Sequence, residues 1–174
     1  MFYSQYRVGQ AGRGFKLWKL RSMQRSNHGL RITADGDARV THIGHFLRKY
    51  KLDELPQFWN VLRGDMSFVG PRPEVPEYVE FGDSRWQRVL QCRPGITDFA
   101  TLVYRNEEKI LATFENREAG YREHVLPSKL ALNIEYLDHR SLWSDIKLIA
   151  LTARCSFSAS DPDQVSLRRT IFSH

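Results

Sequence analysis

Several features that would narrow the class of this protein are scarce or missing. The 174 residues include only two cysteines, Cys92 and Cys155. Their wide separation matches no metal or redox spacing and indicates reduced thiols in a cytosolic chain. No apolar run approaches the roughly 18 residues of a membrane span, and the N-terminus lacks the apolar core of a secretory signal. A chain of this length is expected to form one domain with a real core.

Acidic residues are missing from the first 34 positions, which hold seven Lys and Arg residues. Because the whole chain carries +6, the remainder carries −1. A basic segment on a nearly neutral body predicts an anionic partner, such as nucleic acid, anionic lipid or a phosphorylated substrate. A solvated basic surface has the same composition, so charge alone does not choose between these partners. The six histidines show no metal-ligand spacing.

Local patterns predict an α+β fold, a helix-rich single domain with a small N-terminal antiparallel β-hairpin. Residues 2–8 and 15–21 are typical of two strands joined by a glycine-rich turn. Thr41 is the expected N-cap of a short helix that ends near residue 49, and Ser128 is the expected cap of a later one. Further helical segments are predicted over residues 74–91, with a break near residues 82–84, and over residues 107–122 and 141–154. A polar loop is predicted over residues 22–38. The polar composition of residues 155–174 predicts a disordered tail.

The most informative stretch is residues 47–74. Pro56 has no backbone donor and fits only the first turn of a helix, which places the helix start near residues 52–54. Asp53 and Glu54 then lie at the helix N-terminus, where the macrodipole stabilises each ionised carboxylate by roughly 0.3–1 kcal/mol. An apolar stripe follows at helical spacing: Leu55, Phe58, Trp59 and Leu62.

Asp53 and Glu54 have more charged residues near them in the sequence than a helix cap requires. An Asp before a helix is most often an ordinary N-cap worth about 1 kcal/mol. Here, however, Arg48 precedes the pair and Arg72 follows it, held between two prolines. Carboxylate oxygens bind Mg²⁺, and guanidinium groups bind phosphate in a bidentate manner. The pattern therefore favours a site for a divalent metal and a phosphate.

The run LDELPQFWNVLRGDMSFVGPRPE closely resembles the defining motif of the bacterial sugar transferases, the monotopic polyprenol-phosphate phosphoglycosyl transferases. The resemblance spans roughly residues 2–153. It continues in three further pieces, FKLWKLRSM at 15–23, THIG at 41–44 and RPGIT at 93–97. It implies a catalytic domain over residues 1–154, with the tail at 155–174.

The resemblance implies transfer of a sugar-1-phosphate from a nucleoside diphosphate sugar, usually a UDP-sugar, to a polyprenol phosphate. UMP leaves, and the lipid product initiates surface polysaccharide or glycoconjugate synthesis. Asp53 would form an aspartyl-phosphosugar intermediate, and Glu54 would be the second catalytic residue and the ligand of Mg²⁺. Arg48 and Arg72 would contact phosphate, with Lys19 and Arg21 as weaker candidates. Where the family often has glycine after RPGIT, this chain has Asp98, so a nucleotide or sugar preference is not carried over.

Members of this family carry a hydrophobic helix ahead of the matched region, and this chain begins about where that helix ends. The expectation is therefore a truncated catalytic portion, or a chain with another anchor. It would associate peripherally with the cytoplasmic face of the inner membrane, or be soluble as an isolated fragment. Two other classes stay open: a basic nucleic-acid-binding domain, for which no recognised motif is present, and a catalytically idle partner protein. The resemblance itself implies no nucleic-acid partner.

Overall fold

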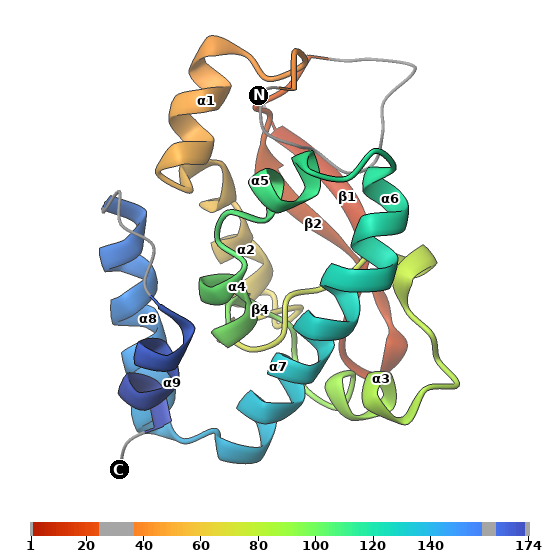
Figure 1. Cartoon of the computed structure of the whole chain (residues 1–174), viewed down its shortest axis with the longest axis vertical. Coiled ribbons are helices and arrows are strands. Elements are labelled where there is room, and N and C mark those ends of the chain that lie inside the picture. Colours follow the sequence, from red (N-terminus) through yellow and green to blue (C-terminus); the bar gives the residue numbers. More distant parts are fainter. Residues whose placement is uncertain (1, 25–36, 158–162, 173–174) are drawn as a thin grey trace.

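A computed structural model describes residues 2–24, 37–157 and 163–172, with helices surrounding two small two-stranded sheets (Figure 1). This arrangement confirms the predicted α+β fold. The strands are β1 (Phe2–Val8), β2 (Gly14–Leu20), β3 (Ser67–Val69) and β4 (Gly95–Thr97). The α-helices are α1 (His42–Lys49), α2 (Gln57–Leu62), α3 (Ser84–Val89), α4 (Phe99–Val103), α5 (Glu107–Ala112), α6 (Arg117–Gly120), α7 (Leu126–His139), α8 (Leu142–Phe157) and α9 (Gln164–Phe172). Short 3-10 turns are η1 (Gln10–Gly12), η2 (Leu52–Glu54) and η3 (Pro76–Tyr78), and η4 (Tyr121–Val125) is a π-helical turn.

The N-terminal hairpin forms as predicted. Strand β1 pairs antiparallel with β2, with Phe2 opposite Leu20 and Val8 opposite Gly14. The turn between the strands needs left-handed backbone at Gly12, whose φ is 73°, a conformation that glycine adopts without steric cost. Most of the loop predicted over residues 22–38 lies outside the described residues.

The second sheet was not predicted from the sequence. Strand β3 pairs in parallel with β4, with Ser67 opposite Gly95 and Val69 opposite Thr97. The two backbone segments approach so closely that a Cβ on Gly95 would lie 2.2 Å from the backbone nitrogen of Gly70. This contact brings the end of β3, and with it Arg72, against the beginning of α4.

The helix predictions are partly right. Thr41 caps α1 as expected, because its Oγ1 accepts a hydrogen bond from the Gly44 amide at 2.9 Å. Ser128 was wrong as a cap: α7 already begins at Leu126, and the Ser128 hydroxyl donates back to the carbonyl of His124. The predicted break near residues 82–84 is confirmed, because Asp83 caps α3. The part before it forms only η3, and the segment predicted over 107–122 divides into α5, α6 and part of η4.

Helix α2 has an inverted pattern of burial: its polar side faces the protein and its apolar side faces outward. Its polar residues Gln57 and Asn60 are buried, and Asn60 accepts from the Trp18 amide of β2 at 3.1 Å. Its apolar stripe faces outward, and Leu62 is 79% exposed. Other large apolar side chains are exposed on α1 (Ile43, Phe46), on β3 (Phe68) and on α8 (Leu142, Trp143, Ile146, Ile149). Within the described residues, none of the helices has both the length and the apolar content to cross a membrane.

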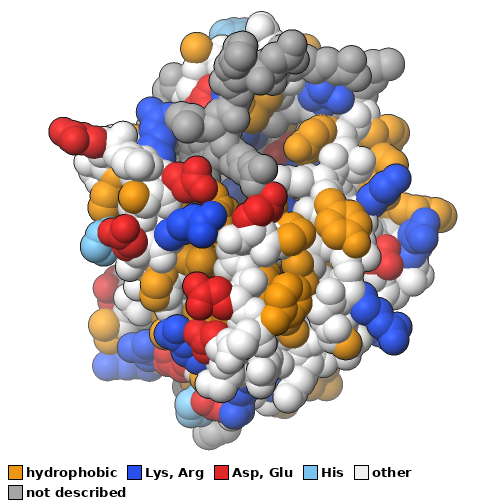
Figure 2. All heavy atoms as spheres, turned by 90° about the vertical axis from the view of Figure 1, so that its right-hand side faces the viewer, with side chains coloured by type: hydrophobic (Ala, Val, Ile, Leu, Met, Phe, Trp, Pro, Cys, Tyr) orange, Lys and Arg blue, Asp and Glu red, His pale blue; other side chains and the backbone are white. Residues whose placement is uncertain are grey.

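The face on the right in Figure 1 has a different character. Figure 2 shows acidic and basic side chains intermingled over this face, with apolar side chains scattered between them. This is the usual composition of a solvated protein surface.

The disordered tail predicted from residue 155 is not what the described residues show. Helix α8 continues to Phe157, and α9 packs beside it (Figure 1). Leu167 and Ile171 of α9 join a core that includes Phe99 and Leu148. Two apolar residues four positions apart are enough to bury one side of a short helix, although the segment as a whole is polar.

Leu167→Ala should lower the free energy of unfolding by about 2–4 kcal/mol, the usual cost of removing a buried leucine side chain. Leu167 is only 2% exposed. Val165 lies on the same helix and is 62% exposed, so Val165→Ala is the matched control, with a change within about 0.5 kcal/mol. Urea unfolding of both variants checks this. Equal, small effects would mean that α9 does not dock on the core.

Candidate active site

Asp53 and Glu54 lie in η2, directly after a left-handed residue. Lys51 has φ 57° and ψ 20°, which costs a non-glycine residue roughly 1–2 kcal/mol. This turn ends α1 and redirects the chain so that the Asp53 side chain points inward, where it is 8% exposed. Among the described residues, Asp53 Oδ1 is buried without a hydrogen-bond partner. Burial, and then the charge of Glu54, raise the pKa of Asp53.

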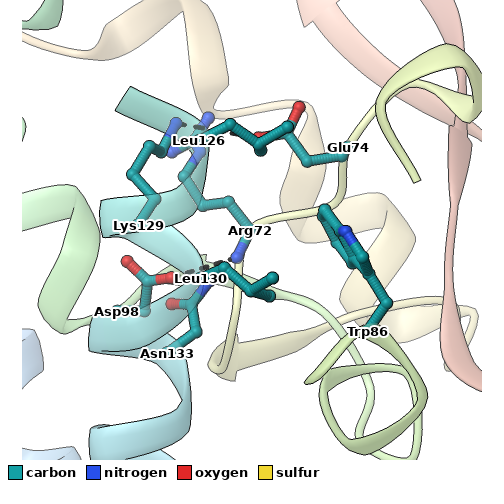
Figure 3. Close-up of a pocket in the computed structure, with 8 residues that line it drawn as sticks. All are labelled: Arg72, Glu74, Trp86, Asp98, Leu126, Lys129, Leu130 and Asn133. Carbon is teal, nitrogen blue, oxygen red and sulfur yellow. Dashed lines mark hydrogen bonds and ion pairs between the residues drawn. The ribbon is translucent and has the colours of Figure 1, made fainter. Parts of the chain in front are cut away.

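Arg72 is placed by the small parallel sheet. It follows β3, and its backbone N–H donates to Asp98 Oδ2 at 3.1 Å. Its guanidinium Nη1 donates to the carbonyl of Ile96 at 2.9 Å. Figure 3 shows Arg72 beside Asp98, Lys129 and Asn133 in a small internal pocket. Arg72 is therefore tied to the β4–α4 segment through both its backbone and its side chain.

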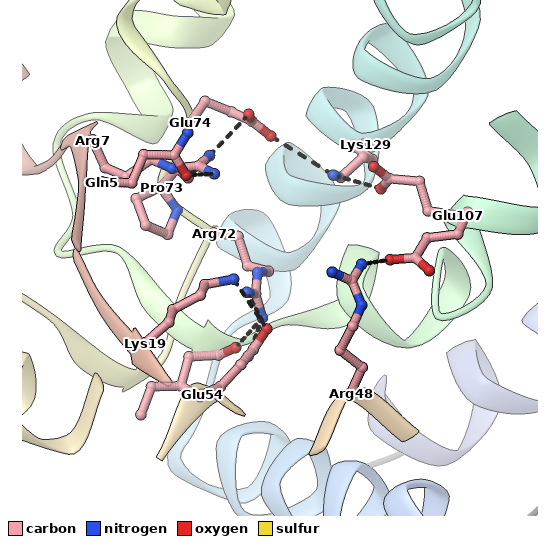
Figure 4. Close-up of polar contacts among 12 residues, drawn as sticks. Gln5, Arg7, Lys19, Arg48, Glu54, Arg72, Pro73, Glu74, Glu107 and Lys129 are labelled. Atoms are coloured by element: carbon pink, nitrogen blue, oxygen red, sulfur yellow. Dashed lines mark hydrogen bonds and ion pairs between the residues drawn. The ribbon is translucent and has the colours of Figure 1, made fainter. Parts of the chain in front are cut away.

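The guanidinium of Arg72 forms a bidentate ion pair with Glu54 (Figure 4). Nη1 lies 2.9 Å from Glu54 Oε2, and Nη2 lies 2.7 Å from Oε1. Lys19 Nζ, from β2, lies 3.6 Å from the same Oε1. Burial opposes ionisation of Glu54, but Arg72 and Lys19 outweigh it and hold the Glu54 pKa well below its usual range. Burial also lowers the pKa of Lys19, against the influence of Glu54.

A second set of ion pairs borders this site. Arg48, from the last turn of α1, pairs with Glu108 of α5. Lys129 of α7 lies 2.8 Å from Glu107 and 3.7 Å from Glu74, and Glu74 in turn pairs with Arg7 (Figure 4). The two neighbouring carboxylates of α5 thus link α1 and α7 across the site.

The structure brings together four of the six residues predicted for the site: Asp53, Glu54, Lys19 and Arg72. Arg48 lies near enough to lower the Asp53 pKa slightly, but its ion-pair partner is Glu108. Arg21 lies elsewhere, with its guanidinium 5.8 Å from the centre of the Tyr3 ring.

The site also contains residues that sequence reasoning did not assign. Gln57 is buried one turn after Asp53, and its Nε2 has no partner among the described residues. Lys129, Glu107 and Glu108 come from helices far along the chain, and no motif marks them. Asp98 was noticed only as a departure from the family pattern, and its position between Arg72 and α4 was not foreseen.

The fit of the site to a metal ion depends on which carboxylate is considered. Among residues 2–24, 37–157 and 163–172, no three His, Cys, Asp or Glu side chains form a group that could hold a metal ion. Both oxygens of Glu54 accept from Arg72, so ligation by Glu54 would require that ion pair to open. Asp53 offers a buried oxygen without a partner. Since Mg²⁺ is often held by one or two carboxylates together with substrate phosphates, the pair fits a metal that arrives with a phosphate ligand.

Comparison with known proteins identifies the family. The model of the family described as bacterial sugar transferase matches residues 1–159. The chain belongs to the bacterial sugar transferase family. The sequence resemblance at residues 52–74 is thereby confirmed.

Curated relatives of this sugar transferase act in related reactions, according to their names. The galactosyl transferase CpsE of Streptococcus agalactiae is 37% identical over 165 residues, which cover 87% of this chain and 33% of the relative. An Aeromonas hydrophila enzyme named UDP-N-acetylgalactosamine-undecaprenyl-phosphate N-acetylgalactosaminephosphotransferase is 35% identical, covering 88% of this chain and 34% of its own length. The UDP-glucose:undecaprenyl-phosphate glucose-1-phosphate transferase of Escherichia coli is 35% identical, with 87% and 32% covered. The sugar transferase chain thus spans about a third of the length of these relatives.

Proposed function

We propose that this chain transfers a sugar-1-phosphate from a nucleoside diphosphate sugar, a UDP-sugar, to a polyprenol phosphate and releases UMP. The observation that carries the proposal is the buried Asp53 oxygen without a partner, set beside the Glu54–Arg72–Lys19 cluster. The names of the relatives supply the class of donor and acceptor.

In this reaction, Asp53 acts as the nucleophile. An Asp53 oxygen attacks the phosphorus that bears the sugar, a new O–P bond forms, and UMP leaves with the electron pair of the broken phosphoanhydride bond. An oxygen of the lipid phosphate then attacks the same phosphorus and displaces Asp53. Each step transfers a phosphoryl group between oxygen atoms, and covalent catalysis divides a displacement between two anions into two easier steps.

The cations around Asp53 and Glu54, the catalytic dyad of this proposal, reduce repulsion between Asp53 and the anionic donor. Arg72 and Lys19 already lie within 3.6 Å of Glu54, and Arg48 approaches from α1. Preorganised cations of this kind stabilise charge on phosphoryl oxygens without reorganising during the reaction. In the described arrangement, Glu54 holds Arg72 in place. This role is additional to the metal ligation expected from the sequence.

Mg²⁺ is part of this proposal. Asp53, whose Oδ1 has no partner among the described residues, would hold it together with the diphosphate, and Glu54 would join once its ion pair with Arg72 opens. The bound ion would neutralise charge on the phosphate oxygens.

The acceptor is a lipid, and the outward apolar stripe of α2 gives a surface on which it could be reached. Phe58 of α2 contacts Phe68 of β3, with ring centres 5.6 Å apart, so the exposed apolar side chains continue from α2 onto β3. In the sequence, Lys49 and Lys51 precede the stripe and Arg63 follows it, with Arg63 Nε 3.6 Å from Asp65 Oδ2. Apolar area combined with nearby cations is the pattern of helices that lie in a membrane interface. We therefore propose that this surface rests on an anionic bilayer.

The test of the activity is UMP release from UDP-sugars in the presence of Mg²⁺ and polyprenol phosphate in detergent micelles. Release that depends on the lipid acceptor is expected. A set of UDP-sugars should be offered, because the sugar preference is open. No release with any donor would remove the proposed activity, and tight binding of duplex DNA instead would favour the basic nucleic-acid-binding class.

Trp59→Glu should weaken binding to anionic vesicles about tenfold or more, because it places a charge in the apolar stripe. The wild-type chain is expected to bind weakly, and less as salt increases, since each Lys or Arg near the surface contributes about 1 kcal/mol. Phe81→Glu is the matched control: Phe81 is 55% exposed, as Trp59 is at 56%, but it packs over the hairpin turn at Gly12. Vesicle sedimentation measures both variants. An equal loss for both would place the membrane contact elsewhere.

A further inference from the structure

Asp98 is a buried carboxylate that connects two distant parts of the chain. It is 1% exposed and lies at the N-cap of α4. Its Oδ1 accepts from the Thr101 amide at 2.5 Å, the usual bond of a helix cap. Its Oδ2 accepts from the backbone amide of Arg72, 26 positions earlier in the chain. The same carboxylate therefore caps α4 and holds the backbone of Arg72, a bond called the tether below.

The bond to Arg72 adds to backbone bonds that already hold this segment. The Gly70 amide donates to the Thr97 carbonyl, and the Gly95 amide donates to the Pro71 carbonyl, each at 3.0 Å. Arg72 lies past the end of β3, and its neighbours Pro71 and Pro73 cannot donate backbone hydrogen bonds. The Arg72 amide is therefore the one donor in this tripeptide, and Asp98 accepts it. The side chain of Arg72 is held by the same segment, through the carbonyl of Ile96. The distance from the Arg72 guanidinium to Glu54 thus depends on where the β4–α4 junction lies.

The residues on both sides of Asp98 are packed into the core. Phe99, the residue after Asp98, is completely buried and packs against Phe172 of α9, with ring centres 5.4 Å apart. Thr97, the residue before it, shares a hydrogen bond of 2.6 Å with Thr152 of α8. Asp98 is therefore fixed on both sides by the core and can act as a stationary anchor. Figure 3 shows its carboxylate directed at the backbone of Arg72.

We propose that Asp98 is a positioning residue of the transfer reaction, which sets Arg72 in the register that places its guanidinium on Glu54 and toward the donor phosphates. This inference rests on the proposed function, because it assigns Asp98 a part in the same site. Asp98 touches no substrate; it acts through Arg72. The role differs from ordinary capping, which would affect stability alone.

Asp98→Ala is the test, with Asp83→Ala as the matched control. Asp83 is also an N-cap aspartate, of α3, and its side chain accepts from the Arg85 amide at 2.7 Å. Both variants lose a helix cap, and Asp83→Ala also loses an exposed ion pair with Arg85. Only Asp98→Ala loses the bond to Arg72. We expect Asp98→Ala to raise KM for the nucleotide sugar about 10- to 100-fold, the loss typical of one hydrogen bond to a charged group. Asp83→Ala should leave KM within about twofold of the wild type.

Hydrogen–deuterium exchange supplies a second measurement that needs no turnover. The Arg72 amide should exchange faster in Asp98→Ala than in the wild type or Asp83→Ala, and Asp98→Asn should be intermediate, because an amide side chain retains one acceptor oxygen for two N–H groups. Unchanged exchange at Arg72 would overturn the tether. Faster exchange with unchanged KM would overturn the positioning role. If the wild type itself shows no turnover, the proposed function fails while the exchange measurement still tests the tether.

Discussion

Asp53→Asn is expected to reduce sugar-phosphate transfer by on the order of 10⁴-fold or more, the size of effect seen when a covalent nucleophile is removed. Asparagine has nearly the shape of aspartate, but its amide neither attacks phosphorus nor leaves as a carboxylate does. UMP release in detergent with a lipid acceptor measures the loss. Retention of more than about a hundredth of the wild-type rate would remove Asp53 from the role of nucleophile.

The same variant should be at least as stable as the wild type. The folded protein raises the pKa of Asp53 through burial and through Glu54, so the native state binds the proton more tightly than the unfolded chain does. Stability from this group is therefore lost as pH rises from the ordinary aspartate pKa, about 3.9, through the raised pKa. Asparagine has no charge to bury and removes this loss. Asp138→Asn, at an exposed position paired with Arg88, is the control for the substitution itself.

Arg72→Ala is expected to combine the largest loss of stability with a loss of activity. Glu54 would remain buried without its bidentate partner, with its side chain only 12% exposed. Removal of one member of a buried ion pair typically costs about 3–5 kcal/mol. Urea unfolding at neutral pH measures this loss, and the transfer assay should show a rate at least about 10³-fold below the wild type. Arg72→Lys should recover part of the stability and little of the rate, because an ammonium group cannot pair with two oxygens at once.

The pH dependence of this variant separates the ion pair from simple loss of packing. Because the folded protein holds the Glu54 pKa below its ordinary value, the pair stabilises the wild type above the ordinary glutamate pKa, about 4.3. This contribution is lost as pH falls toward the lowered pKa. The difference in stability between wild type and Arg72→Ala should therefore shrink under acid. Arg85→Ala, which breaks an exposed pair with Asp83, should show little change at any pH. A difference for Arg72→Ala that is constant from neutral to acid pH would assign its effect to packing.

The sequence was sufficient for features encoded by neighbours in the chain. The hairpin follows from alternating residues around glycines, and the start of α1 follows from the hydroxyl of Thr41. Asp53 and Glu54 were singled out by their adjacency and by the family resemblance, and their catalytic role stays a prediction. Each of these signals lies within one short stretch of the chain, where propensity and capping act.

Features that join distant segments were not predicted. The parallel pairing of β3 with β4 connects strands of three residues each, too short to show a period. The bond between Arg72 and Asp98 depends on that pairing. Helix α9 was missed because a polar composition hid Leu167 and Ile171, whose burial depends on the core that α4 and α8 supply. In α2, the helical spacing of apolar residues indicated one apolar and one polar face. The polar face is the buried one because Asn60 forms hydrogen bonds with β2.

The outward apolar stripe of α2 also determines how far Asp53 would lie from the membrane. The buried Asp53 and Leu55, the first exposed residue of the stripe, are only two positions apart, and a helix with its side chains is about 10–12 Å across. With the stripe in the membrane interface, Asp53 would lie within about one helix diameter of it, near the level of the lipid headgroups. A polyprenol phosphate could then present its phosphate to Asp53 while its isoprenoid tail stayed in the hydrocarbon. Helix α2 would thus fix the distance between Asp53 and the membrane, so that the lipid would not have to leave the bilayer to react.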